Sequence, residues 1–169
     1  MTEETQNYIK THKEFLEIRE LADSTIKIYT SCITQFLEWL YDNCNTTVEA
    51  MTWNDIRLYV TYLKDCKGLN PRTINVHLAQ LRDFYEYVLK KAWDKKEVPF
   101  KHFDEKLPKV PTREQTAMII EHPSNLKHKA LLVVLYSAGL RVSEACRLRF
   151  GDIYINNGPY IYTSRSKNR

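Results

Sequence analysis

Apolar residues recur every three or four positions through most of residues 1–92, and this spacing constrains the fold more than any other feature. Three segments show it most clearly: Ile26, Tyr29, Ile33, Phe36, Leu37 and Leu40; then Ile56, Tyr59, Val60 and Leu63; then Ile74, Leu78, Leu81, Tyr85 and Val88. A fourth segment, residues 3–19, shows it with Tyr8, His12, Phe15 and Leu16. The spacing predicts four amphipathic helices in a compact bundle, which we assign to a first domain over residues 1–92.

The expected helix starts carry side chains that can accept hydrogen bonds from free backbone N–H groups. Thr52 with Asp55 three positions later is a capping-box pattern. At 70–71 an Asn precedes a Pro, which suits the first turn of a helix. Asp23 or Ser24 is the expected cap of the helix that follows it.

Composition places the chain among ordinary globular proteins. Of its 169 residues, 43% are apolar and 27% charged, and only 4 glycines occur, which favours a mainly helical fold. No apolar run approaches the roughly 18 residues of a membrane span, and the polar first residues do not resemble a signal peptide. The four cysteines show no CxxC pair and no metal-ligand spacing, so we expect reduced thiols, no metal site and a cytoplasmic location.

The net charge of +4 is unevenly distributed along the chain. Residues 1–89 carry 9 Lys and Arg against 13 Asp and Glu, whereas residues 90–113 carry 8 against 4 and residues 141–169 carry 6 against 2. Clustered positive charge is typical of proteins that bind polyanions. A solvated basic loop explains the same charges equally well, so charge alone leaves both interpretations open.

The second half of the chain begins with a basic segment that contains prolines and no periodicity. Residues 93–111 therefore predict an extended linker. Thr112 and Gln115 form another capping-box pattern at the start of a helix. Residues 126–138 are apolar on nearly all sides, so we expect them to be the buried core helix of a second domain. Gly139 follows where a left-handed helix end is expected.

The last predicted elements are a short helix and a β-hairpin, within a second domain assigned to residues 112–169. Ser143 is the expected cap of a helix that runs through Arg149. β-forming residues at 153–155 and 160–163 flank an Asn-Asn-Gly turn, which is a strong hairpin signal. The chain ends where a further strand is expected to begin, so we expect this domain to be incomplete.

Arg141 is a charged residue set directly after the most apolar stretch of the sequence. A charge against apolar surface is costly unless it is paired or binds an anion. The guanidinium fork suits phosphate oxygens, which it can bind with two parallel hydrogen bonds. An ion pair with Glu144, three positions on, is the alternative explanation.

Residues 136–144, Tyr-Ser-Ala-Gly-Leu-Arg-Val-Ser-Glu, with Leu-Arg-Phe-Gly-Asp-Ile at 148–153, resemble the opening of the catalytic domain of tyrosine recombinases, the phage integrase family. The first domain is similar to that family's core-binding bundle through Ser24, Thr25, Tyr29, Phe36, Trp39, Leu40 and the stretches 73–75 and 81–85. The resemblance starts near residue 8. It implies a mainly α fold: an N-terminal four-helix core-binding (SAM-like) bundle, then the start of an α+β catalytic domain with a β-hairpin.

The resemblance also implies a chemistry. In this family a tyrosine cuts DNA through a 3′-phosphotyrosyl link without metal or nucleotide cofactor, two arginines hold the scissile phosphate, and a hairpin lysine helps protonate the leaving oxygen. It implies that Arg141 is the first of these arginines and that Glu144 supports it. The stretch Arg165-Ser166-Lys167-Asn168-Arg169 is one residue shorter than the family hairpin, so the lysine position is open between Lys167, the only lysine in residues 142–169, and Arg165, which lies closer to that position. An arginine holds its proton too tightly to act as an acid, and a basic strand end that contacts DNA backbone or solvent is the alternative for both.

Double-stranded DNA is the partner that the resemblance implies, with self-association on DNA, and with neither a membrane nor a small-molecule cofactor. In the family, bundle and catalytic domain clamp the duplex while the linker crosses its backbone. The residues expected to contact DNA are Lys27, Thr30, Arg72, Asn75, Arg82, Arg165 and Arg169. The negative balance of residues 1–89 predicts weak, salt-sensitive affinity.

The sequence also departs from the family pattern. No His follows Arg141, and Tyr154, Tyr160 and Tyr162 match strand positions and not the motif of the nucleophile. We therefore expect a DNA-binding portion of a site-specific recombinase or integrase that does not cleave DNA by itself. The alternatives are a non-catalytic DNA-binding regulator derived from the family and a helical protein-interaction module; the charge distribution argues against the last.

Overall fold

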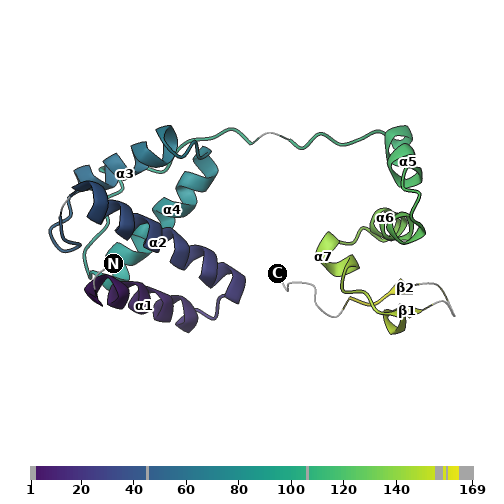
Figure 1. Ribbon diagram of the computed structural model, residues 1–169, viewed down its shortest axis with the longest axis horizontal. Coiled ribbons are helices and arrows are strands. Elements are labelled where there is room, and N and C mark those ends of the chain that lie inside the picture. The colour runs from purple at the N-terminus through teal and green to yellow at the C-terminus, as the bar shows by residue number, and fades with distance from the viewer. Residues whose placement is uncertain (1–2, 45, 106, 155–157, 159, 164–169) are drawn as a thin grey trace. The chain divides into compact units, whose positions relative to one another are not determined.

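The computed structural model describes residues 3–44, 46–105, 107–154, 158 and 160–163, and these form two compact units, residues 1–105 and 106–169 (Figure 1). The elements of the first unit are α1 (Glu3–Ile18), α2 (Asp23–Cys44), α3 (Trp53–Asp65), α4 (Pro71–Asp83) and the π-helix η1 (Phe84–Val88). Those of the second are α5 (Arg113–Glu121), α6 (Leu126–Ala138), α7 (Val142–Ala145), the 3-10 helix η2 (Phe150–Asp152), β1 (Ile153–Tyr154) and β2 (Tyr160–Ile161). The predicted fold class, mainly α with a β-hairpin, is confirmed. No helix among the described residues is long and apolar enough to cross a membrane.

The first unit is the predicted helical bundle, in which α2 contacts α1, α3 and α4. Nearly all of the predicted apolar stripes face its interior, and Phe36 and Tyr59 are fully buried with their rings edge to face at 5.0 Å. Tyr8, Phe15, Tyr29 and Val88 are the exceptions, since these four are only half-buried. Burial of this one-sided apolar surface is the main stabilising term of the bundle.

Two of the three predicted helix caps of this unit are confirmed. The Asp55 N–H donates to Thr52 Oγ1 (3.4 Å) while the Thr52 N–H donates to Asp55 Oδ2 (2.7 Å). The Thr73 N–H donates to the Asn70 side chain (2.8 Å), directly before the proline that opens α4. The expected cap of α2 at Asp23 or Ser24 is wrong, because the helix begins at Asp23 and both residues lie inside its first turn. The Thr25 and Ile26 N–H groups donate instead to the Ala22 carbonyl.

The π-helix η1 extends α4 in a way that the sequence did not predict. The Leu89 N–H donates to the Phe84 carbonyl five positions back (3.1 Å), which widens the last turn. Phe84, the first residue of η1, is fully buried, and Lys90, with φ at 56°, follows the end of the helix.

The segment that follows η1, residues 93–105, packs against the helices of the first unit. Trp93 lies against the rings of Trp53 (5.3 Å) and Tyr85 (5.8 Å), and Val98 is buried in the core. An ion pair between Arg57 and Glu97 (2.6 Å) holds the same segment from α3. Residues 93–105 contain no helix. These contacts hold them against the bundle, so they belong to the first unit and do not form a free linker.

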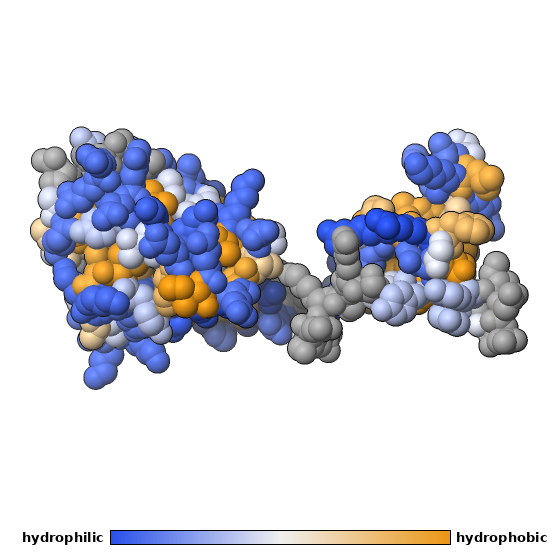
Figure 2. Space-filling model, turned by 90° about the horizontal axis from the view of Figure 1, so that it is seen from below, coloured by the Kyte–Doolittle hydropathy of each residue, from blue (hydrophilic) through white to orange (hydrophobic). Residues whose placement is uncertain are grey.

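The second unit confirms the predicted elements but not the predicted core. Thr112 and Gln115 form their capping box, and Gly139 ends α6 in the left-handed region (φ 62°, ψ 27°). No residue of α6 is buried, however, and Ala145 is the only buried residue in the described part of this unit. A helix that is apolar on all sides needs neighbours on all sides, whereas α6 has its main contacts with α5 and α7. Figure 2 accordingly shows hydrophobic side chains at the surface of this unit.

The short helix and the hairpin follow Gly139. The predicted cap at Ser143 is wrong, because α7 begins at Val142 with Arg141 in the cap position. The helix stops at Ala145 instead of Arg149, since the Arg147 and Leu148 N–H groups bond to carbonyls three positions back. The hairpin is confirmed: its strands are antiparallel, with Ile153 opposite Ile161 and Tyr154 opposite Tyr160. Residues 156 and 157 of its predicted turn lie outside the described residues.

Candidate functional site

The end of α6 and the start of α7 position Arg141. Gly139 turns the chain out of α6, and Arg141 then adopts an extended backbone (φ −69°, ψ 150°) before α7 begins. The Arg141 N–H donates to Glu144 Oε2 (2.8 Å), and its guanidinium Nη1 donates to Glu144 Oε1 (2.8 Å). One carboxylate therefore fixes both the backbone and the side chain of Arg141.

This pair leaves most of the guanidinium open. The Arg141 side chain is 63% exposed and carries five N–H donors, of which the contact with Glu144 uses one. The hydrogen bond from the Arg141 backbone N–H, followed by that from its side chain, lowers the pKa of Glu144, so this carboxylate stays charged. The ion pair that sequence reasoning offered as an alternative is thus present, and its geometry also leaves Arg141 able to bind an anion.

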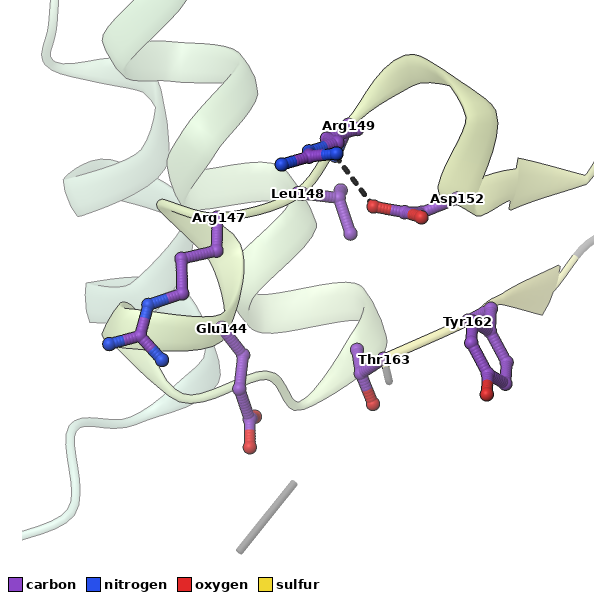
Figure 3. A pocket seen from close by; sticks show the side chains of 7 residues that line it. All are labelled: Glu144, Arg147, Leu148, Arg149, Asp152, Tyr162 and Thr163. Atoms are coloured by element: carbon purple, nitrogen blue, oxygen red, sulfur yellow. Dashed lines mark hydrogen bonds between the residues drawn. The ribbon is translucent and has the colours of Figure 1, made fainter. Parts of the chain in front are cut away.

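A pocket of about 290 Å³ lies beside this pair. Its lining residues come from α7, the following turn and the end of the hairpin (Figure 3): Glu144, Arg147, Leu148, Arg149, Asp152, Tyr162 and Thr163. The Arg149 N–H donates to Asp152 Oδ2 (2.8 Å), and the Tyr162 N–H donates to the Asp152 carbonyl (2.9 Å). Asp152 therefore ties the hairpin to the turn that carries the two arginines.

Sequence reasoning missed Arg147 and Arg149 as site residues. Both are exposed and line the pocket with Glu144 and Asp152, and with Arg141 they make three arginines within nine residues of sequence. The signal in the sequence is the excess of basic residues after residue 140, which does not identify individual positions. Such a set of side chains offers hydrogen-bond donors to an anion.

The described residues offer little to a metal ion. Within them, no three His, Cys, Asp or Glu side chains lie close enough together to hold one. The residues around Arg141 include two carboxylates, and each is already engaged by backbone N–H groups or a guanidinium.

The other predicted site residues lie in different surroundings. Lys27 is exposed on α2, whereas Thr30 is half-buried, with its hydroxyl oxygen enclosed and unpartnered within the described residues. The three predicted contacts on α4, Arg72, Asn75 and Arg82, are each engaged by residues 100–105. The last group of predicted residues, Arg165, Lys167 and Arg169, lies outside the described part of the chain.

Comparison with known proteins finds matches to both units. The family model described as "Phage integrase, N-terminal SAM-like domain" matches residues 8–95, and the model "Phage integrase family" matches residues 109–169. The tyrosine recombinase XerD of Oceanobacillus iheyensis is 30% identical over 155 residues, which cover 85% of this chain and 52% of that protein. XerC of Bacillus subtilis is 28% identical over 162 residues, covering 89% and 53%.

A solved structure shares the fold. The crystal structure of XerA recombinase has a TM-score of 0.50 and 23% identity, over 89% of this chain and 52% of that one. The chain thus spans about half the length of the curated relatives it matches. Because one family model covers the helical bundle and a second covers the unit that holds Arg141, the chain belongs to the phage integrase family.

Proposed function

We propose that the chain is the DNA-binding portion and the opening of the catalytic domain of a site-specific tyrosine recombinase. In this proposal residues 1–92 are the core-binding domain, residues 93–111 the linker and residues 112–169 the start of the catalytic domain. Double-stranded DNA is the partner, and self-association takes place on that DNA. The relatives named tyrosine recombinases support this assignment.

One observation carries the proposal: Glu144 holds Arg141 by backbone and side chain while the guanidinium stays largely exposed. A cation that is already oriented loses little freedom when it binds a phosphate, and it can stabilise charge that develops at phosphorus. Glu144 is the supporting residue in this arrangement. It orients the arginine and does not neutralise all of its donors.

Two further sets of side chains complete the proposed site. Arg147 and Arg149 line the adjacent pocket, where they can bind neighbouring phosphates of the same strand. On the hairpin side, we assign to Lys167 the protonation of the leaving oxygen, because it is the lysine that residues 142–169 contain.

A salt titration tests the proposal. Binding of the purified chain to a fluorescently labelled duplex is measured by anisotropy between about 50 and 200 mM salt. We expect the logarithm of the binding constant to fall linearly with the logarithm of salt concentration, with a slope of about −0.9 for each phosphate contacted. Affinity should be modest, because residues 1–89 carry an excess of four acidic residues. A chain with no saturable, salt-dependent binding would not be a DNA-binding portion of a recombinase.

A further inference from the structure

Residues 100–105, here named the strap, lie along the polar side of α4. The Asn75 side-chain amide donates to the Lys101 carbonyl (2.8 Å), and the Lys101 N–H donates to Asn75 Oδ1 (2.7 Å). A side-chain amide that pairs with both backbone groups of one residue fixes the register of the strap on the helix. The strap is therefore seated at a defined position and does not merely pass over α4.

The arginines of α4 meet the strap on both sides of Asn75. Arg72 pairs with Glu105 (3.0 Å), and its guanidinium lies over the ring of Phe103 (5.1 Å). About two helical turns after Asn75, the Arg82 guanidinium lies over the ring of Phe100 (5.9 Å). The strap thus engages, from one side, all three α4 residues expected to contact DNA.

The chemistry of the strap imitates that of a nucleic acid backbone. Its charged side chains include the carboxylates of Asp104 and Glu105 against the single ammonium of Lys101. The Glu105 carboxylate takes a position on Arg72 that suits a phosphate, because guanidinium binds both anions through the same donors. The aromatic rings of the strap lie under the guanidinium groups, and the bases of a nucleic acid also offer ring faces to arginine.

The strap is also held loosely enough to be displaced. The segment before it is anchored by the buried Val98, whereas Phe100 is 42% exposed and the Glu105 side chain is 79% exposed. Exposed ion pairs are weak and are screened by salt, and segments held by such contacts open locally without unfolding the domain.

We propose that the strap is an autoinhibitory contact: it covers the phosphate-binding face of α4, and duplex DNA must displace it to reach Arg72 and Asn75. This inference rests on the proposed function, because it requires that the first unit binds DNA. It predicts that the apparent affinity for DNA is reduced by the fraction of molecules in which the strap is docked.

Duplex affinity of strap variants tests the inference. Glu105→Gln removes the carboxylate that binds Arg72, and Phe103→Ala removes the stacked ring without changing charge. Neither residue is an expected DNA contact, so each change acts on the strap alone. If the strap is docked in about two thirds of molecules, each variant should bind a labelled duplex about threefold more tightly than the unchanged chain. Glu86→Gln, which removes an exposed carboxylate on η1, is the matched charge control and should change affinity less.

Hydrogen exchange of the Lys101 amide provides a readout that does not depend on affinity. This N–H donates to Asn75, so it should be protected in the free chain and exchange faster when saturating duplex displaces the strap. Affinities of both strap variants equal to that of Glu86→Gln, or unchanged protection on saturating DNA, would overturn the inference while leaving DNA binding intact. Absence of duplex binding in every protein would instead overturn the proposed function.

Discussion

The two units are built from the same kind of element but differ in what those elements bury. In the first unit, α2 is apolar on one side, and that side meets three partners, so residues such as Phe36 and Leu40 are almost fully enclosed. In the second, α6 is apolar on all sides, yet Val133 and Tyr136 remain exposed. The number of packed neighbours, not the hydrophobicity of a helix, decides how much apolar surface leaves water.

The largest expected effect is a core substitution in the first unit. Phe36→Ala should lower the free energy of unfolding by about 3–5 kcal/mol, because it removes a fully buried ring and leaves a cavity. Urea unfolding followed by tryptophan fluorescence is the measurement, since all three tryptophans lie in residues 1–105.

The matched change in the second unit is Val133→Ala on α6. It should leave the tryptophan-detected transition unchanged and alter the overall stability by less than about 1 kcal/mol, because the side chain is 44% exposed. Equal losses for the two variants would show that the units do not differ in burial.

The next effect is a dependence of stability on pH that belongs to the first unit. Burial lowers the pKa of His12 from 6.5 to about 4, partly opposed by the charge of Asp83, so the native state holds a neutral ring. Between these values the unfolded chain binds more protons than the folded one, and stability falls as the pH drops. We expect His12 to account for a loss of about 2 kcal/mol between pH 7 and pH 5.

Urea unfolding of His12→Leu at pH 7 and pH 5 isolates this contribution. Both ring nitrogens of His12 are buried without a hydrogen-bond partner in the described structure, so an apolar replacement should keep the fold. The pH dependence should decrease in His12→Leu and stay unchanged in His128→Leu, which alters an exposed residue of α6. His77, whose pKa burial also lowers, accounts for part of the remaining slope.

The smallest effect compares the two capping boxes. Thr52→Ala should lower the stability of the first unit by about 1 kcal/mol, because the Asp55 N–H at the start of α3 loses its acceptor. Thr112→Ala removes the corresponding contact of α5. It should leave the tryptophan-detected transition in place, since that helix belongs to the other unit; a shift of similar size would mean that the two units unfold together.

Local signals predicted much of this structure. The capping pairs at Thr52 and Thr112, the proline start of α4 and the left-handed Gly139 depend on residues close together in sequence, and all were confirmed. Some local predictions failed, such as the caps at the starts of α2 and α7, which lie one or two residues from the predicted positions. The larger failures depend on distant partners. The exposure of α6 is set by how many elements surround it, and the π-turn at Phe84 interrupts a stripe whose spacing seemed continuous.

The candidate site shows the same limit. The motif around Arg141 indicated the arginine and its supporting Glu144, because both lie in one short stretch. The contribution of Arg147 and Arg149 to the pocket depends on the position of the hairpin, and the cover over Arg72 and Asn75 depends on a segment about 30 residues away. Such contacts leave no periodic signal in a single sequence.

The most direct test of the central claim, that Arg141 is held ready to bind a DNA phosphate, is the salt dependence of duplex binding in Arg141→Ala. Loss of one phosphate contact should make the slope of log binding constant against log salt less steep by about 0.9. Arg113→Ala, which removes an exposed arginine from the start of α5, should leave the slope close to that of the unchanged chain. A slope unaffected by Arg141→Ala would contradict the account.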